Sequence, residues 1–524
     1  MEVIVIGIDG GTFDLIEPWA NKGELPNFKK IMDGGVYSNL KTTYPPLTGP
    51  AWVSMVTGCN PGKHGIFDYI ASDINKLRVN DSSSVKVPYL WELLSEANKS
   101  VSIVNVPMTY PPSKVNGYMI TSIMSRGEDI TYPEDFKKEL EEGMGRGYKI
   151  GINVMPQKGR EKEHLAEVYD WHDSVLKATF YMLENKQSDF FMTVFPITDV
   201  VSHAYFDYME EDSEFKDEVL KAYKTVDEAL GKILDVIDEK TNVIIVSDHG
   251  FGRLKGTVNI NNFLVEKGHI KFKRSAILKN LLFKLGITPT NAFKIVKKLK
   301  IAGWARKVSM EKRNKVLGSF VGYNDLNMKQ TLAYSRGHVG QVHLNKEAIA
   351  NMGLRYEDIR EKLIEDFKNL RNPETGSPLM TDVLTREEMY NGPYSDMGAD
   401  LFLIFDGFNY IAYPLFAADN KVVTKHLVHR SGTHRMNGIF LGYGPNFKSK
   451  LRLKDKSIYD ITPTVLHLMN SKIPLNLDGK VMEDAIRDIE RKPEYVQYKK
   501  REEESKEKEE EKVIQRLKDL GYLS

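Results

Sequence analysis

The sequence predicts an α/β protein with a mostly parallel central sheet, helices on both faces of that sheet, and an inserted cap region. Apolar runs of strand length (3–8, 190–195 and 243–247) alternate with longer segments of helical periodicity (161–184 and 212–238). This alternation is typical of units in which a helix connects two parallel strands. Acidic residues follow all three apolar runs, at the edge where such sheets bind ligands.

The strand and helix pattern also predicts how the chain is divided. Residues 1–255 together with 425–490 are expected to form one catalytic domain, which 524 residues can readily build. Residues 256–424 interrupt the pattern, and we interpret them as a cap that covers the site and selects the substrate. Residues 491–524 are dense in Lys and Glu, which predicts a solvated, charged helical tail.

Composition excludes several classes of protein. The net charge is +1, so nucleic-acid binding is not expected. Apolar runs of eighteen residues are absent from the sequence, which predicts no transmembrane segment. A single cysteine rules out an intramolecular disulfide. The first residues show no secretory signal, and the two observations together predict a cytoplasmic enzyme.

Residues 271–315 carry many Lys and Arg side chains and only one acidic residue, Glu311. Their apolar residues recur at helical spacing, as in a basic amphipathic helix that contacts an anionic membrane surface. The same pattern is compatible with a solvated cap, or with a funnel for an anionic substrate. Peripheral membrane contact through 271–315 is therefore one of three open interpretations.

Four segments offer Asp and His side chains in positions that suit metal binding. The most informative is Asp248-His249-Gly250, which follows the apolar run 243–247. The other residues are Asp9 after the run 3–8, Asp199 and His203 at helical spacing, and the late His434. Carboxylate and imidazole ligands suit zinc, manganese or iron. A cluster this rich predicts a two-metal phosphoryl-transfer site.

This order of motifs resembles the alkaline phosphatase superfamily, and within it the type I phosphodiesterase/nucleotide pyrophosphatase branch. The N-terminal signature carries most of the likeness. It comprises 7–10, 25–28, 44–52 and 56–66. The resemblance covers roughly 1–70, 190–255 and 425–480, and it implies an alkaline-phosphatase-like fold.

The resemblance also implies a mechanism. Thr48, ten residues before Gly58, would be the nucleophile and would form a covalent phosphothreonine. One metal would be held by Asp9, Thr48, Asp248 and His249, and the other by Asp199, His203 and His434. The cofactors would be two divalent ions, with zinc expected and manganese or iron as alternatives. The substrate would be a small phosphate diester or monoester.

Four residues are candidate substrate contacts. Tyr69 stands where this branch usually has an Asn that contacts a phosphate oxygen, which puts a nucleotide substrate in doubt. Arg336 and His338 lie in a Gly-rich segment, and an Arg there can bind a phosphate through two hydrogen bonds. Arg430 lies shortly before His434 and is expected near the metals.

Three alternatives stay open at this point. A phosphomutase of the same superfamily, similar to phosphoglycerate mutase, would be a transferase on the same fold, although it has a serine nucleophile with a long insert just after it. An actin-like sugar kinase would use Gly10-Gly11-Thr12 as a phosphate turn between two strands of a hairpin. A non-enzymatic metal-binding protein would lack a ligand or the nucleophile, and no such residue is missing here.

Overall fold

The computed structural model describes residues 1–70, 79–123, 125–126, 129–289, 291–292, 320–336, 339–412, 420–425, 430–487 and 492–497. These residues form two compact units. Within the described residues, unit 1 comprises 1–253, 390–398 and 430–497, and unit 2 comprises 254–389 and 399–425. The short segment 390–398 therefore groups with unit 1, whereas the sequence placed it in the insert. A role of unit 2 as a cap stays a prediction.

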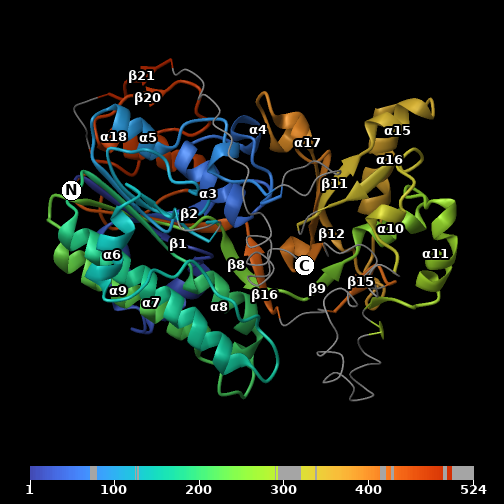
Figure 1. The fold of residues 1–524 in the computed structure, drawn as a ribbon, viewed down its shortest axis with the longest axis horizontal. Helices are drawn as coiled ribbons and strands as arrows, with labels where there is room; N and C mark the ends of the chain where they lie inside the picture. The colour runs from blue at the N-terminus through green and yellow to red at the C-terminus, as the bar shows by residue number, and fades with distance from the viewer. Residues whose placement is uncertain are drawn as a thin grey trace. The chain divides into compact units, whose positions relative to one another are not determined.

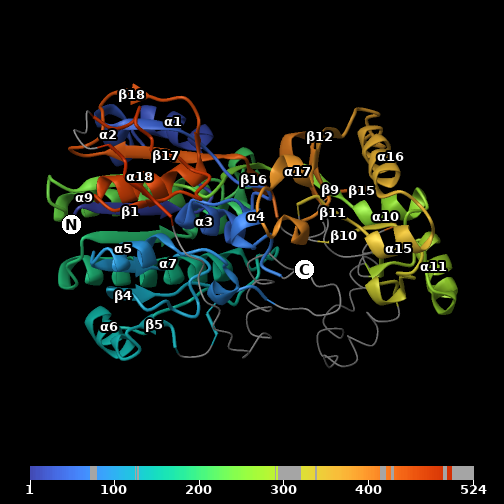
Figure 2. The ribbon, with the colours of Figure 1, turned by 90° about the horizontal axis from the view of Figure 1, so that it is seen from above.

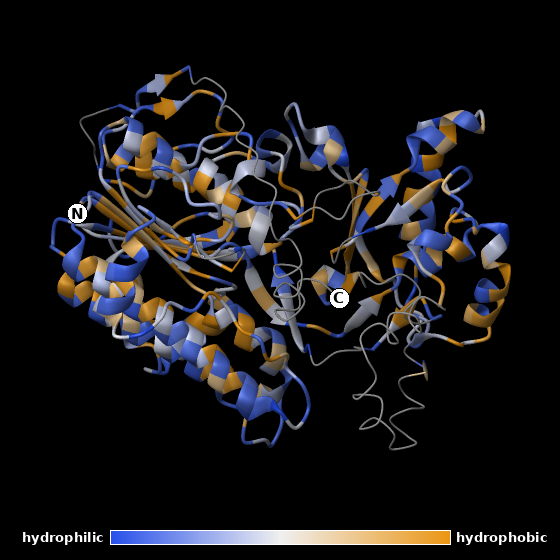
Figure 3. Ribbon diagram, viewed as in Figure 1, coloured by the Kyte–Doolittle hydropathy of each residue, from blue (hydrophilic) through white to orange (hydrophobic). Residues whose placement is uncertain are grey.

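A mixed sheet forms the centre of unit 1 (Figure 1). Its middle strands run parallel in the order β7-β1-β6-β3-β4. They are β1 (Val3–Ile8), β3 (Val101–Val104), β4 (Gly117–Ile120), β6 (Phe190–Phe195) and β7 (Asn242–Val246). All residues of β1, β3, β6 and β7 are buried, as expected for strands covered on both faces. Figure 3 shows these strands as a predominantly hydrophobic layer.

The outer part of the sheet departs from the parallel arrangement that the sequence predicted. Strand β17 (Asn437–Tyr443) runs antiparallel to β7 on one side and to β2 (Val36–Lys41) on the other. Strand β5 (Thr131–Tyr132) is antiparallel to β4. The short strands β18 (Leu451–Arg452) and β19 (Lys456–Ser457) pair parallel with β2. An apolar run predicts a strand but not its direction, which depends on the path of the connecting chain.

Helices cover both faces of this sheet, as Figures 1 and 2 show. One face carries α7 (Glu161–Asn185), α8 (Ile197–Tyr205) and α9 (Glu218–Val236), and the other carries α3 (Thr48–Thr57), α5 (Leu90–Glu96) and α18 (Ile461–Leu468). Unit 1 also contains α1 (Phe13–Asn21), α2 (Pro26–Gly34), α4 (Pro61–His64) and α6 (Phe136–Met144). Long, half-apolar segments such as α7 and α9 pack one face on the sheet and leave the other in solvent.

Two short strand pairs complete unit 1. Strand β8 (Gly250–Arg253) pairs antiparallel with β16 (Gly432–Arg435), which joins segments far apart in the sequence. Strand β20 (Ile473–Pro474) pairs parallel with β21 (Tyr495–Val496). Strand β21 belongs to the segment that was predicted to be a helical tail. Residues 498–524 of that tail lie outside the described residues.

Unit 2 has its own core around a largely antiparallel sheet in the order β10-β11-β13-β14-β9-β15, with β12 paired to β13. Its strands are β9 (Gly256–Val258), β10 (Ala333–Ser335), β11 (Gln341–Leu344), β12 (Met380–Thr385), β13 (Leu401–Phe405), β14 (Tyr410–Ala412) and β15 (Val423–Thr424). Its helices are α10 (Ile260–Glu266), α11 (Ile277–Lys284), α15 (Lys346–Asn351), α16 (Tyr356–Lys368) and α17 (Arg386–Met389). A search of the described helices in both units finds none that is long and apolar enough to cross a membrane.

Candidate metal centre

Three aspartates meet at the carboxyl edge of the parallel strands in unit 1. Asp9 directly follows β1, Asp248 follows β7, and Asp199 lies in the first turn of α8 after β6. The strand register pairs Ile8 with Phe195 and Gly7 with Val246, so the three strands end at the same level. All three side chains are buried. Ligands that are distant in the sequence are therefore brought to one edge by sheet pairing.

The first group of ligand atoms gathers around His249. Its Nε2 atom lies 3.1 Å from Asp248 Oδ2 and 3.6 Å from Asp9 Oδ1. The same atom lies 3.4 Å from Thr48 Oγ1. The Nδ1 atom of His249 faces the carbonyl oxygen of Gly250 at 3.1 Å, so Nδ1 carries the proton and Nε2 presents its lone pair. The four residues predicted for one metal thus lie together.

The second group contains Asp199, His203 and His434. Asp199 Oδ1 lies 3.3 Å from the Nε2 atom of each histidine. The Nδ1 atom of His203 lies 2.9 Å from the Gly432 carbonyl oxygen, and that of His434 lies 2.7 Å from the Pro46 carbonyl oxygen. A carbonyl can only accept, so Nδ1 of each ring is the donor in these contacts, and Nε2 faces Asp199.

The two groups are not separate, because His249 belongs to both. Its ligand atoms lie within 4.8 Å of those of Asp9 and Asp248, and also of those of Asp199 and His434. The rings of His249 and His434 are stacked, with centroids 3.5 Å apart. The sequence assigned His249 to one metal only, since spacing along the chain cannot show that two motifs share an imidazole.

The buried charges strongly perturb one another. Burial raises the pKa of Asp9 well above its usual value, and the neighbouring carboxylates of Asp248 and Asp199 raise it further. Burial and the charge of Asp199 raise the pKa of Asp248 in the same way. Burial also raises the pKa of Asp199, but His203 and His434 outweigh it, and the net shift is downward. Three carboxylates in so small a volume require positive charge to stay ionised together.

The donor set fits divalent cations. Asp9 Oδ1 and Asp248 Oδ2 are buried and accept no hydrogen bond from any residue that the structure describes. Buried carboxylate oxygens normally have a partner, and such oxygens are the ligands that zinc, manganese and iron accept beside imidazole. The arrangement therefore fits metal ions at both groups, and it leaves the identity of the metal open.

Thr48 is placed by the start of a helix. It is the first residue of α3, and its side chain is fully buried. The N–H groups in the first turn of a helix lack intrahelical acceptors and favour anions. The turn before α3 is tied to the metal centre, because the Pro46 carbonyl accepts the hydrogen bond from His434. The hydroxyl and the anion-binding end of the helix are held together.

Tyr69 lies against this turn. Its side chain is buried, and the neighbouring Thr48 side chain lowers the pKa of its hydroxyl, against the larger effect of burial. Burial raises the pKa of Tyr69 well above its ordinary value, and the charges of Asp9 and Asp248 add to that rise, so the phenol stays protonated. Its ring passes so close to Gly49 that a Cβ atom there would lie 3.0 Å from Tyr69 Cε1. The residue that departs from the family pattern thus borders the predicted nucleophile.

The other predicted substrate contacts have different surroundings. Arg430 lies on His203, with Nε 3.1 Å from Nδ1 and Nη2 3.1 Å from Nε2 of the imidazole. Arg336 belongs to unit 2, where it opposes the rise in the pKa of Tyr323 that burial causes. His338 lies outside the described residues. Substrate contact by these three residues stays a prediction.

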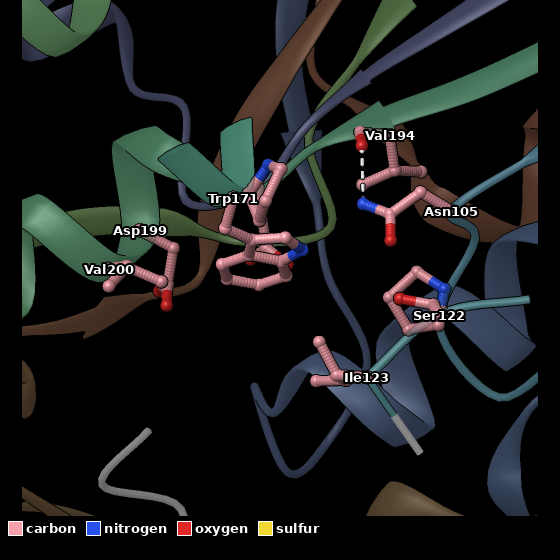
Figure 4. Close-up of a pocket in the computed structure, with 10 residues that line it drawn as sticks. Asn105, Ser122, Ile123, Trp171, Val194, Asp199 and Val200 are labelled. Atoms are coloured by element: carbon pink, nitrogen blue, oxygen red, sulfur yellow. Dashed lines mark hydrogen bonds between the residues drawn. The ribbon is translucent and has the colours of Figure 1, made fainter. Parts of the chain in front are cut away.

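A small pocket that the sequence did not reveal adjoins two of the aspartates (Figure 4). It is lined by Asp9, Asn105, Pro107, Ser122, Ile123, Trp171, Val194, Pro196, Asp199 and Val200. Asn105 directly follows β3, and its Nδ2 donates to the Val194 carbonyl at 2.9 Å. The rule that located the aspartates, a polar residue just after a buried parallel strand, applies to Asn105 as well and could have found it.

The sugar-kinase alternative fails on local structure. It requires a second hairpin strand directly after Gly10-Gly11-Thr12. Instead the Thr12 side chain caps a helix by accepting a hydrogen bond from the Asp14 N–H, and α1 follows. The neighbours of β1 in the sheet are the parallel strands β6 and β7. Residues 1–70, which the structure describes throughout, therefore contain no such hairpin after Gly10-Gly11-Thr12.

Comparison with known protein sequences identifies a family. Residues 3–392 match the family described as type I phosphodiesterase/nucleotide pyrophosphatase. Ectonucleotide pyrophosphatase/phosphodiesterase family member 1 of Mus musculus is 23% identical over 279 residues, and the Homo sapiens protein is 24% identical over 279 residues. Each match covers 51% of this chain and 26% of the relative, so it spans about a quarter of the relatives' own length.

Solved structures show the same fold. Human ectonucleotide pyrophosphatase/phosphodiesterase 5 superposes with a TM-score of 0.51 at 14% identity, covering 93% of this chain and all of the other. An inactive threonine-to-alanine variant of the murine protein in complex with AMP gives the same TM-score and identity, with 93% and 99% of the two chains covered. With the family match over residues 3–392, this chain belongs to the type I phosphodiesterase/nucleotide pyrophosphatase family.

Proposed function

We propose that this protein is a metal-dependent hydrolase of small phosphate esters, with diesters as the preferred class and Thr48 as the nucleophile. One observation carries the proposal. Thr48 Oγ1 lies 3.4 Å from the His249 Nε2 atom, inside the same buried cluster as Asp9 and Asp248 and at the start of a helix. Family membership supports the same reaction class.

Two sets of residues would hold the metals. Asp9, Thr48, Asp248 and His249 would hold one ion, and Asp199, His203 and His434 the other, with His249 close to both. Divalent ions, with zinc expected, would lower the pKa of a bound hydroxyl and offset the charge of the phosphate oxygens. The remaining chemistry belongs to the protein's own side chains.

In the first step Thr48 Oγ releases its proton to solvent and attacks phosphorus, and the bond from phosphorus to the leaving oxygen breaks. The alcohol departs with a proton from solvent, and the phosphoryl group stays on Thr48. In the second step water attacks phosphorus, the Thr48 Oγ–P bond breaks, and phosphate or a phosphate monoester is released. The first-turn N–H groups of α3 would bind phosphate oxygens throughout. The Tyr69 hydroxyl would donate to Thr48 or to the phosphoryl oxygen beside it.

The test combines metal analysis with two reporter substrates. We would measure the metal content of the purified full chain by mass spectrometry, then hydrolysis of bis-p-nitrophenyl phosphate and p-nitrophenyl phosphate. About two metals per chain with faster cleavage of the diester supports the proposal. Two metals with cleavage of the monoester alone would move the assignment to a phosphatase or a phosphomutase. Absence of tightly bound metal and of turnover would refute it.

The nucleophile is tested by a matched pair of variants. Thr48→Ala removes the hydroxyl and should lower kcat by roughly a thousandfold or more, while metal content changes little. Thr48→Ser keeps a hydroxyl at the same position and should retain much of the activity. Acid quenching during turnover should trap the phosphorylated form of the wild-type enzyme. The same treatment of Thr48→Ala should yield none. Full activity in Thr48→Ala would remove this residue from the mechanism.

A further inference from the structure

The helix α11 in unit 2 turns its apolar face outward. Ile277, Leu278, Leu281 and Leu285 are 63%, 67%, 53% and 70% exposed. At 100° per residue they fall within one arc of about 100° around the helix axis. Figure 3 shows hydrophobic colour along the outer side of α11. These four side chains, together with the 51% exposed Ile287, form what we call the α11 ridge.

The inward side of the same helix is already occupied. Phe283 and Ala276 are buried, and Phe283 is part of the core of unit 2. Leucines of an ordinary surface helix would point the same way as Phe283, toward the core. The exposed ridge is therefore additional to the packing that holds the helix. A contiguous apolar patch on a surface marks a contact with another molecule or a membrane.

The charged side chains of residues 271–289 are all positive. Lys271, Lys273, Arg274 and Lys284 are exposed beside it. Residues 271–289 contain no Asp or Glu. The nearby acid Asp325 is paired with Lys279 at 3.2 Å, so it does not offset the exposed cations. In the described part of the chain, the ridge is thus an apolar strip bordered by exposed lysine and arginine side chains.

We propose that the α11 ridge binds the surface of an anionic lipid bilayer. Lysine and arginine side chains beside an apolar helix face can contact anionic head groups while the leucines enter the boundary with the acyl chains. The positive charge beside the ridge favours an anionic lipid surface over a second copy of the chain as its binding partner. In a symmetric dimer through the ridge the same cations would face each other, and like charges oppose such contact.

The experiment measures binding of the full chain to vesicles. Phosphatidylcholine vesicles with and without phosphatidylglycerol are mixed with the protein and separated by flotation, at low and at high salt. The test variant is Leu278→Ser/Leu281→Ser/Leu285→Ser. The matched control is Met352→Ser/Leu354→Ser, which changes side chains that are 48% and 40% exposed elsewhere in unit 2. A third variant, Lys271→Gln/Arg274→Gln/Lys284→Gln, removes charge alone.

The wild-type protein and the control should bind vesicles that contain phosphatidylglycerol, and high salt should weaken that binding. The leucine variant should bind on the order of a hundredfold more weakly, because three exposed apolar side chains are lost. The charge variant should lose its preference for phosphatidylglycerol. Absence of wild-type binding, or equal binding by the leucine variant, would overturn the proposal.

Two further readouts keep this proposal distinct from the proposed hydrolase activity. Hydrolysis of bis-p-nitrophenyl phosphate in vesicle-free solution should be the same in the wild type and in all three variants. The molar mass in solution is measured by light scattering for the wild type and the leucine variant. A wild-type dimer that the leucine variant converts to a monomer would overturn lipid binding and assign the ridge to self-association.

Discussion

The Nε2 atoms of His203 and His434 face each other at 2.9 Å, and neutral rings cannot form a hydrogen bond there. Each ring already donates its Nδ1 proton to a backbone carbonyl. Two lone pairs at this distance repel, and the Asp199 carboxylate beside them adds negative charge. A cation beside these atoms offsets that repulsion, and the Arg430 guanidinium supplies one, with Nη2 3.1 Å from His203 Nε2. A metal ion held by Asp199, His203 and His434 would supply a second.

Metal stoichiometry should separate a shared ligand from an unshared one. His203→Ala removes a ligand from the second group only, so we expect about one metal per chain to remain. His249→Ala removes an imidazole that lies near both groups, so we expect both metals to be lost or strongly weakened. Metal content after gel filtration, measured by mass spectrometry, checks this prediction. Equal loss in the two variants would show that His249 is not shared.

Tyr69→Phe should lower kcat with bis-p-nitrophenyl phosphate by roughly 10- to 100-fold. The substitution removes the hydroxyl beside Thr48 and leaves the ring in place. A hydrogen bond to a charged group contributes about 1.5–3 kcal/mol, which sets this range. Metal content should not change, because Tyr69 is not one of the residues proposed to hold the metals. Unchanged kcat would show that the hydroxyl only fills space.

Gly49→Ala should reduce activity through Tyr69. The added Cβ would lie 3.0 Å from Tyr69 Cε1 and 3.1 Å from Cδ1, which forces the ring away from Thr48. If this is the cause, Gly49→Ala should cost little further activity in a Tyr69→Leu background, where the ring is gone. A double-mutant cycle on kcat measures this coupling. Additive losses would mean that Gly49 acts independently of Tyr69.

His172→Leu should make the protein more resistant to acid. Neither ring nitrogen of His172 has a hydrogen-bond partner in the described part of the chain, and burial lowers its pKa from 6.5 to about 3. Below pH 6.5 the unfolded chain binds a proton that the folded chain excludes until pH falls to about 3. Above pH 6.5 the free energy of unfolding is not reduced by this residue. Between pH 6.5 and about 3 it falls by about 1.4 kcal/mol for each pH unit.

Urea unfolding of wild-type and His172→Leu proteins at neutral pH and near pH 5 tests this expectation. The wild type should lose about 2 kcal/mol more than the variant over that interval. The side chain packs edge-on against Phe195, so leucine keeps an apolar contact at a similar volume. Parallel pH dependence in the two proteins would contradict the assignment and indicate that His172 is protonated or hydrated when folded.

The predicted ligands came together because each is fixed by a local rule. Asp9 and Asp248 follow buried parallel strands, and Asp199 and His203 share one turn of a helix. These features depend on short stretches of sequence. His434 was a candidate from its residue type, but its assignment to the second metal came from the family resemblance, since β16 reaches the site by pairing with β8.

The features that the sequence missed depend on contacts between distant segments. The direction of β17 is set by the chain path through unit 2, and the sharing of His249 is set by ring stacking with His434. The contact of Tyr69 with Thr48 arises because the chain after α4 returns to the first turn of α3. Periodicity and residue type carry no information on such approaches.

The pairing of β16 with β8 also fixes the order in which the centre can be completed. During synthesis, Asp9, Thr48, Asp199, His203, Asp248 and His249 all emerge before unit 2, whereas His434 emerges after it. A chain that ends within unit 2 therefore carries the ligands of the first group but an incomplete second group. In the proposed two-metal site, the second group is therefore completed only after translation has passed the entire insert.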